Sequence, residues 1–388
     1  MLADAGPRQA FSALSKPALS LYSLKCKMTN MAKSATMTVD MTSYYNKIGE
    51  IAPPLSERIT TLTDPRLIAL NRQIAGIVPK NWEKKYRFYV KNIDANESVG
   101  VNETEKFRIA SVIKVPWVMA FYHWIENEVP ENEKKGELKF VRDRIHGILV
   151  KSNNYFSDDI VERLGEKNLG ACLAGYGIKL PEGKLTEAEA RKILANPKLK
   201  PLLKEYTLRP RNSNRKKGEL IGYRENLFEL VGLEKVNRIM ETMGMDLKVK
   251  QIIPESGRVY ENLISMVQIC RAFELLYASA SGNGPISKQS AAEMYTNMSS
   301  KEKPRFFPKP FEGNPVYHKT GLNDQAVSDV ALVNVGGTWY ALGFSLKAAS
   351  FGKEYAQARY DFINLIAKGI ADTMTGPSEL ANVRLSRR

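Results

Sequence analysis

Segments with the residue pattern of β-strands lie near both ends of this chain, and a long helical region separates them. Aromatic and β-branched residues gather between turn residues in five such segments, at 86–93, 98–102, 316–320, 328–335 and 339–347. From residue 111 to about residue 300, apolar residues recur instead at helical spacing. This order predicts one antiparallel sheet of about five strands, built from both ends of the chain, with an all-helical domain inserted into it.

Helices are expected beside the strand segments and throughout the insertion. Asp64-Pro65 precedes apolar residues at helical spacing, which indicates a helix start, and a final amphipathic helix is expected over 355–374. Within the insertion, the spacing predicts helices over 112–126, 158–164, 186–193, 233–243 and 263–278. The fold class is therefore α+β, and a cleft is expected where the sheet and the insertion meet, since small-molecule sites favour such junctions.

The same patterns predict the domain boundaries. A discontinuous sheet domain is expected to combine residues 53–110 and 310–376, and the helical domain to occupy residues 111–309. Residues 377–388 are expected to form a flexible tail, and residues 1–52 a disordered basic leader.

The leader has no clear export signal. Its longest apolar stretch, residues 17–24, is interrupted by Ser20 and Ser23, whereas a secretory signal needs an unbroken apolar core of about 7–15 residues. The segment is therefore a disordered leader, a degenerate export or transit signal, or the result of a mis-assigned start. No apolar run approaches the roughly 18 residues of a membrane-spanning helix, so no transmembrane segment is expected.

The formal net charge of +15, from 57 Lys and Arg against 42 Asp and Glu, favours anionic partners. Much of the excess lies in residues 179–224, a possible insertion with thirteen basic and five acidic residues. No aromatic ladder or base-reading motif accompanies these charges, so nucleic acid is not an expected partner. This basic excursion is either a solvated helical surface or a docking surface for an anionic cell-wall polymer.

Cysteine and histidine spacing argues against several other classes of protein. The three cysteines and three histidines show neither disulfide nor zinc-finger spacing, so neither a disulfide scaffold nor a zinc finger is expected. A Ser-His-Asp triad is disfavoured because no Gly-x-Ser-x-Gly motif occurs. His318 is expected to be a strand residue whose ring has a partner, rather than a base.

Ser111 and Lys114 form the first candidate for chemistry. Ser-x-x-Lys occurs four times in the chain, but only the copy at Ser111 begins a long apolar helix. Residues three apart on a helix face the same way, and a desolvated lysine can remove the proton of a serine hydroxyl. A helix start also favours a developing oxyanion, because its N–H groups are free.

Two further motifs follow in the chain, Ser152-Asn153-Asn154 before a helical stretch and Lys319-Thr320-Gly321 at the end of a strand. With Ser-x-x-Lys, this ordered set resembles the penicilloyl-serine family and, within it, the class A β-lactamases, whose motifs are Ser-x-x-Lys, Ser-Asp-Asn and Lys-Thr-Gly. The resemblance covers roughly residues 60–375. It implies a β-lactamase/transpeptidase-like fold and chemistry through an acyl-serine.

The resemblance also implies catalytic roles. Ser111 would attack the substrate carbonyl, and Lys114 would act as its base or hold its proton network. Ser152 would pass a proton to the leaving nitrogen. The oxyanion hole would consist of the backbone N–H groups of Ser111 and Leu322.

Substrate-binding roles follow in the same way. Asn154 would bind a side-chain amide of the substrate. Lys319 would supply charge for the substrate carboxylate and keep Lys114 partly neutral, since two close ammonium groups disfavour each other. Thr320 would hydrogen-bond that carboxylate, and Gly321 would let the substrate backbone approach the strand.

Each motif also has a plainer interpretation, and two depart from the family pattern. Ser152 and Asn154 are also suited to cap a helix, and Lys319 and Gly321 to be an ordinary strand lysine and turn residue. Asn153 stands where the family has Asp. No Glu-x-x-Leu-Asn loop is found, and Glu255, the candidate hydrolytic base, lies in a Pro-Glu-Ser-Gly stretch that is equally an ordinary turn.

These features predict a serine hydrolase of class A β-lactamase type that opens β-lactam amides without metal or cofactor. A missing hydrolytic base would favour the first alternative, a D-alanyl-D-alanine peptidase or esterase that uses the same residues. The second alternative is a non-catalytic module that binds an anionic wall polymer. The resemblance implies export to the bacterial periplasm or cell envelope.

Overall fold

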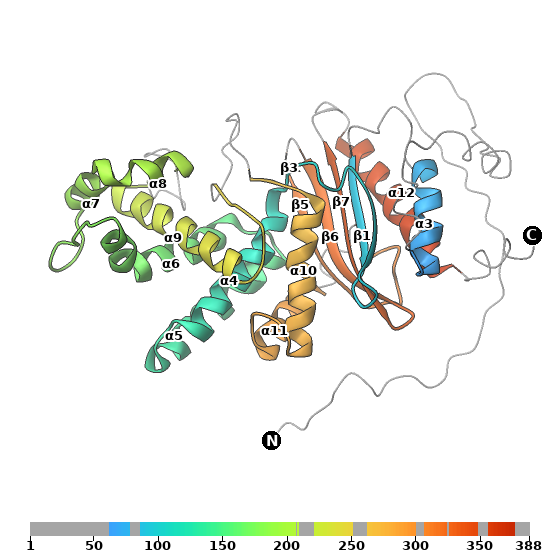
Figure 1. The fold of residues 1–388 in the computed structure, drawn as a ribbon, viewed down its shortest axis with the longest axis horizontal. Coiled ribbons are helices and arrows are strands. Elements are labelled where there is room, and N and C mark those ends of the chain that lie inside the picture. The colour runs from blue at the N-terminus through green and yellow to red at the C-terminus, as the bar shows by residue number, and fades with distance from the viewer. Residues whose placement is uncertain are drawn as a thin grey trace, which may run out of the picture. The chain divides into compact units, whose positions relative to one another are not determined.

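The computed structural model describes residues 62–77, 86–206, 208, 221–250, 262–299, 306–323, 326–347 and 356–376 (Figure 1). The predicted leader, the predicted tail and Glu255 lie outside these described residues. The basic excursion is described through residue 206, at residue 208 and over residues 221–224.

A five-stranded antiparallel sheet joins the two ends of the chain (Figure 1). Its strands are β1 (Tyr86–Asn92), β2 (Glu97–Val101), β5 (Val316–Leu322), β6 (Ala326–Val335) and β7 (Thr338–Lys347), in the order β2-β1-β7-β6-β5. The join is the pairing of β1 with β7, in which Val90 lies opposite Leu342. The sheet predicted from strand patterns at both ends is confirmed, and β5 forms one of its edges.

Helices cover both faces of this sheet (Figure 1). On one side, α3 (Pro65–Ile77) packs against α12 (Ala356–Thr375), and buried side chains such as Leu70 and Ile366 join the core of the sheet. On the other side, α10 (Met266–Ser281) packs on β6 and β7. The two helices predicted beside the strand segments are therefore present as α3 and α12, whereas α10, predicted within the helical insertion, packs on the sheet.

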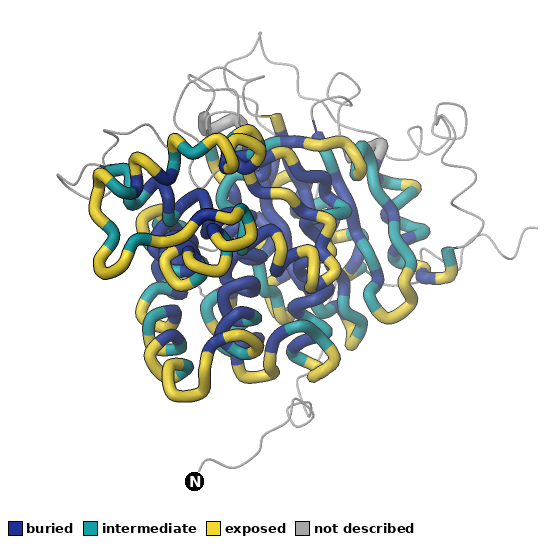
Figure 2. Tube along the Cα trace, turned by 60° about the vertical axis from the view of Figure 1, so that its left-hand side comes forward, coloured by how far each residue is buried: buried dark blue, intermediate teal, exposed yellow. Residues whose placement is uncertain are grey.

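α4 (Lys114–Asn127) is buried along most of its length, and α5 (Glu131–Leu149), α6 (Asn154–Gly175) and α9 (Tyr223–Thr242) pack on it. α7 (Glu187–Leu194) and α8 (Lys200–Glu205) pack on α9, and α11 (Lys288–Met298) packs on α5 and α10. Figure 2 shows buried inner turns and exposed outer turns in this region. The boundary that separates it from the sheet as a domain of its own stays a prediction.

Two glycines bring α6 and α9 into close contact. A Cβ atom at Gly165 would lie 1.8 Å from the carbonyl oxygen of Phe228, and one at Gly232 would lie 2.0 Å from that of Val161. No larger residue fits at either position without moving a backbone. α6 is thus held closely along α9, and the first residue of α6, Asn154, belongs to the candidate site.

Four predicted helix starts differ from the structure. The helix expected from residue 233 begins ten residues earlier, at Tyr223, as α9. The helix expected from residue 263 begins at Met266, because Leu263–Ile264 forms a short strand, β4, that pairs with β3 (Phe107–Arg108). The helix expected from residue 112 begins as a 3₁₀ turn over Ala110–Ile113 before α4. The helix expected from residue 158 begins four residues earlier, after the cap described below. Tertiary pairing and capping set these starts, and apolar spacing does not report either.

No helix within the described ranges is both long enough and apolar enough to cross a membrane.

Candidate active site

The 3₁₀ turn Ala110–Ile113 carries Ser111 and leads directly into α4. Side chains three residues apart are eclipsed on a 3₁₀ helix, so Ser111 and Lys114 lie on the same side of this turn. The Lys114 backbone N–H donates to the Ser111 carbonyl oxygen. Ala110 has a φ of 50°, a left-handed conformation that costs a non-glycine residue roughly 1–2 kcal/mol. Such strain persists only where the surrounding packing imposes it.

Lys114 is a buried amine held by neutral oxygen atoms. The residue is only 3% exposed. Its Nζ donates hydrogen bonds to the Ser152 carbonyl oxygen and to Asn154 Oδ1, each at 2.6 Å. Burial, and then the positive charge of Lys319, lower the pKa of Lys114 to about 7, while the charge of Asp158 acts in the opposite direction. Burial beside Lys319 thus favours the unprotonated amine, which is able to accept a proton.

The residue before α6 supplies the helix cap. Asn153 Oδ1 accepts hydrogen bonds from the backbone N–H groups of Tyr155 and Phe156, at 2.8 Å and 3.3 Å. The cap is thus Asn153, and the side chains of Ser152 and Asn154 are left to face the two lysines. Ser152 has a φ of 57°, so the backbone is left-handed on this side of the site as well.

Lys319 contacts Ser152 from strand β5 of the sheet. It is 1% exposed, and its Nζ donates to Ser152 Oγ and to the Thr320 carbonyl oxygen, each at 2.8 Å. β5 and the turn before α6 are therefore joined through Lys319 and Ser152. The structure thus brings the motifs at residues 152 and 319 into direct contact.

Gly321 allows β5 to approach the turn that carries Ser111. A Cβ atom at this position would lie 2.5 Å from the carbonyl oxygen of Ile109 and 3.3 Å from Ala110 Cβ. The glycine was expected to make room for the backbone of a substrate. In the structure, the room is needed by the protein itself, because the two segments touch there.

The free edge of β5 presents the backbone of Leu322. The Asn323 N–H donates to the Ala326 carbonyl oxygen, and the Asn334 N–H donates to the Pro315 carbonyl oxygen. In an antiparallel pair every second residue is hydrogen-bonded to the partner strand, so residues 315, 317, 319, 321 and 323 are those bonded to β6. Leu322 falls between these positions, so its N–H points away from β6. It is directed out of the sheet at the edge that lies against the Ser111 turn.

A pocket of about 320 Å³ opens at this junction. It is lined by Ser111, Leu149, Val150, Lys151, Ser152, Asn154, Asn297, Met298, His318, Thr320 and Leu322. Five of these residues were predicted for the site, while Lys114 and Lys319 lie buried behind its wall. Glu255 is outside the described residues, so its predicted position relative to Ser111 stays a prediction.

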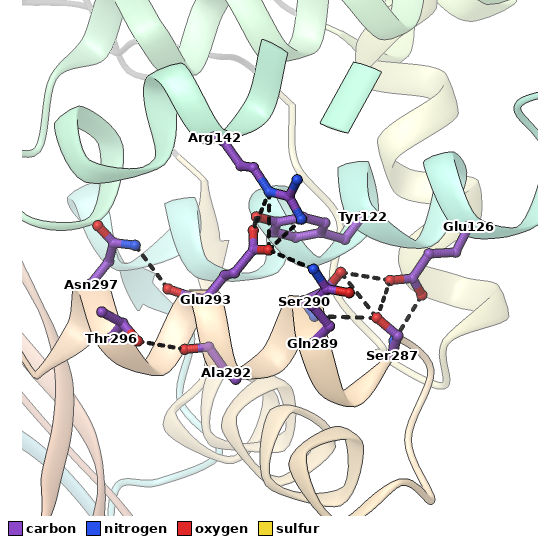
Figure 3. A network of polar contacts seen from close by, with 10 residues as sticks. All are labelled: Tyr122, Glu126, Arg142, Ser287, Gln289, Ser290, Ala292, Glu293, Thr296 and Asn297. Carbon is purple, nitrogen blue, oxygen red and sulfur yellow. Dashed lines mark hydrogen bonds and ion pairs between the residues drawn. The ribbon is translucent and has the colours of Figure 1, made fainter. Parts of the chain in front are cut away.

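Polar contacts hold α11, whose last residues line the pocket, against α4 and α5 (Figure 3). Glu293 accepts from Tyr122 Oη at 2.8 Å and from Arg142 Nε at 3.0 Å. Glu126 accepts from Ser287 and Ser290, at 2.7 Å and 2.6 Å between side-chain oxygens. The pocket wall formed by Asn297 and Met298 is thus anchored on a helix that is tied at its start and middle.

Sequence patterns gave no role in the site to two ionisable residues of this region. His318 lines the pocket, and its Nδ1 lies 3.0 Å from Oδ1 of Asp329, so its ring does have the expected partner. The other residue is Asp158, which is fully buried and whose negative charge raises the pKa of Lys114. Its spacing is the signal that could have found it, because it follows Asn154 by four residues and so lies one helical turn further along α6. No group of three His, Cys, Asp or Glu residues suited to a metal ion occurs in the described part of the chain.

Known proteins resemble this chain in two comparisons. A family model described as the beta-lactamase enzyme family matches residues 69–134 and 225–374, more than half of the chain. The match omits residues 135–224, which contain Ser152, Asn154 and the basic excursion. None of the curated proteins matches the chain.

Solved structures are similar at low identity. The TLA-3 extended-spectrum beta-lactamase is 15% identical, with a TM-score of 0.49 over 80% of this chain and 99% of that chain. PBP-A is 15% identical, with a TM-score of 0.42 over 80% of this chain and 96% of its own. The beta-lactamase from Sphaerobacter thermophilus DSM 20745 is 17% identical, with a TM-score of 0.42 over 75% of this chain and 91% of that chain.

Proposed function

The chain belongs to the beta-lactamase enzyme family, and on this basis we propose that it is a serine hydrolase of class A type that opens β-lactam amides. The reaction would proceed through an acyl-enzyme on Ser111. One observation carries the proposal: Lys114, with a pKa of about 7, lies one 3₁₀ turn from a serine that lines a pocket.

Acylation would use the contacts around the two lysines. Neutral Lys114 accepts the hydroxyl proton of Ser111, whose Oγ attacks the carbonyl carbon of the substrate. The N–H groups of Ser111 and Leu322 stabilise the resulting oxyanion. Ser152, which receives a hydrogen bond from Lys319, delivers a proton to the nitrogen as the C–N bond breaks.

Substrate recognition would use the remaining predicted residues. Asn154 binds a side-chain amide of the substrate, and Thr320 binds its carboxylate. Lys319 contributes positive charge near that carboxylate from behind the wall. Gly321 lets β5 lie against the turn that carries Ser111.

Hydrolysis of the acyl-enzyme requires an activated water, and Glu255 is our candidate for its base. Without such a base, the acyl-enzyme would persist. The chain would then act as a D-alanyl-D-alanine peptidase or esterase with the same acylating residues. The two possibilities share the first step and differ in the rate of the second.

The test is incubation with a chromogenic cephalosporin, followed by stopped-flow absorbance and intact-protein mass spectrometry. We expect rapid turnover that Ser111→Ala abolishes and that Ser213→Ala, at another Ser-x-x-Lys, leaves intact. A stable adduct on Ser111 without turnover would instead support the peptidase. A folded protein that forms no adduct contradicts both.

Glu255→Gln tests the proposed base of the second step. This variant should trap the acyl-enzyme, and unchanged turnover removes Glu255 from the mechanism.

The basic excursion supports a second proposal, an anionic cell-wall polymer as a docking partner, in keeping with export to the cell envelope. Within its described part, seven basic residues are exposed: Lys179, Lys184, Arg191, Lys192, Lys198, Lys200 and Lys204. Binding of purified anionic wall polymer should weaken with salt and with Lys→Gln changes on α7 and α8. Polymer binding without any adduct on Ser111 would identify a non-catalytic binding module.

A further inference from the structure

The pocket beside Ser111 needs a group that contacts the carboxylate of a substrate directly. Lys319 is 1% exposed, is already bonded to Ser152 Oγ, and is absent from the residues that line the pocket. Among the described residues that do line it, the side chains able to carry positive charge are those of Lys151 and His318. Lys151 is exposed, whereas His318 is partly buried and lies in strand β5.

His318 is held in a fixed orientation by a buried carboxylate. Its Nδ1 lies 3.0 Å and 3.2 Å from the two carboxylate oxygens of Asp329, which is 1% exposed. Asp329 is itself fixed, because it also accepts the backbone N–H of Phe307 at 3.1 Å. With Nδ1–H assigned to Asp329, the opposite ring nitrogen, Nε2, has no hydrogen-bond partner within the described residues.

His318 also stands beside the residue proposed to bind the carboxylate. Side chains two residues apart on a strand project from the same face, so those of His318 and Thr320 lie next to each other on β5. Asp329 lies directly opposite Thr320 on β6, on that same face. The imidazole edge and the threonine hydroxyl can therefore meet one ligand from neighbouring positions.

We propose that His318 is a specificity-determining residue that binds the carboxylate of the substrate, with Asp329 as its positioning residue. In its imidazolium form, the ring donates Nδ1–H to Asp329 and Nε2–H to the ligand. The Thr320 hydroxyl provides a second donor. This inference rests on the proposed function, and it transfers the direct contact from Lys319 to His318.

The experiment compares benzylpenicillin with its methyl ester, which lacks the anionic carboxylate. The measured quantity is the second-order rate constant for adduct formation on Ser111. We expect His318→Gln to lower it roughly tenfold for the acid and less than about twofold for the ester, because only the acid loses a charge-assisted hydrogen bond. Asp329→Asn should reduce the same preference for the acid, with a smaller change.

Two further variants serve as comparisons. His123→Gln makes the same substitution at a histidine of α4 whose ring bonds Pro285, and it should leave the acid-to-ester ratio unchanged. Lys151→Gln removes the competing cation. The proposal is overturned if Lys151→Gln lowers the ratio and His318→Gln does not, or if His318→Gln slows acid and ester equally.

A binding measurement separates this inference from the proposed function. In the Ser111→Ala protein, the dissociation constants of the acid and the ester are measured by calorimetry, with and without His318→Gln. Suppose that the wild-type protein forms no adduct, but that the Ser111→Ala protein binds the acid more tightly than the ester and loses this difference with His318→Gln. That result contradicts the proposed function alone. Equal affinities for acid and ester contradict the inference, whatever the activity.

Discussion

Two concave regions of this chain differ in volume and in the pairing of their charged side chains. The cleft among α5, α6 and α9 measures about 650 Å³, against about 320 Å³ for the pocket beside Ser111. It is lined by Phe140, Arg144, Asp159, Glu162, Arg163, Glu166, Leu169, Lys184, Leu185, Arg224, Glu225 and Phe228. The larger region thus holds more charged side chains than the smaller one.

Ion pairs neutralise the guanidinium groups of the larger cleft. Arg144 Nε lies 3.0 Å from Asp159, and Arg163 lies 2.9 Å from Glu166. Arg144 also lies over the ring of Phe140, 3.8 Å from its centroid. The pair of Arg144 with Asp159 joins α5 to α6, and both guanidinium groups have a carboxylate partner.

The smaller pocket instead keeps a buried amine among neutral oxygens, beside a second lysine. The consequence is a pKa of about 7 for Lys114, where an ordinary lysine stays protonated. Perturbed titration of this kind is typical of reacting groups, while neutralised pairs are typical of structure. Chemical state therefore distinguishes the two regions better than size does.

Removal of the buried amine should have the largest effect. Lys114→Met is expected to slow acylation of Ser111 roughly a thousandfold, because proton transfer by a positioned base is worth about 10²–10⁴ in rate. The measurement is the rate of adduct formation by mass spectrometry. An acylation rate within a few-fold of wild type would show that another group takes the proton.

The close approach of β5 to the Ser111 turn gives the next largest effect. Gly321→Ala places a methyl group 2.5 Å from the Ile109 carbonyl oxygen, so the strand and the turn must separate. We expect acylation to fall about a hundredfold from the resulting misplacement. Gly136→Ala is the control, because nothing lies within 4 Å of its added methyl group. Equal rates for the two variants would contradict the prediction.

The pH dependence of acylation should shift in opposite directions for two neighbours of Lys114. Acylation requires the neutral amine, so its rate should rise with pH around a midpoint near 7. Lys319→Met removes a positive charge that lowers the pKa of Lys114, and the midpoint should move to higher pH. Asp158→Asn removes a negative charge that raises this pKa, and the midpoint should move to lower pH.

The position of the midpoint is the relevant observable, because either substitution can also change the maximal rate. It is read from adduct formation over a pH series in which the protein stays folded. Midpoints that shift in the same direction, or not at all, would show that Lys114 does not control the profile.

The smallest effect is expected in the larger cleft. Glu166→Gln removes an exposed partner of Arg163, and such pairs contribute roughly 0.2–1 kcal/mol. Acylation of Ser111 should be unchanged, and urea denaturation should show a loss of stability within that range. A large loss of acylation would remove the contrast between the two regions.

Motif order carried most of what could be predicted about the site. The strand patterns placed the sheet, and the residues at 111, 152, 154, 320 and 322 do meet at one pocket. Spacing could not reveal which residue caps α6, because Ser152, Asn153 and Asn154 are all residue types suited to a cap. It could not reveal the pairing of His318 with Asp329 either, because this contact joins two strands and carries no periodic signal.

The amino-acid sequence by itself determined the secondary-structure order and the set of residue types available for chemistry, because periodicity and motif order are local properties. Only the tertiary structure decided which charges are buried together. Desolvation and the nearby Lys319 lower the pKa of Lys114, and both arise only when α4, α6 and β5 pack around it. The reactive state of that amine therefore belongs to the fold, although its position was evident in the sequence.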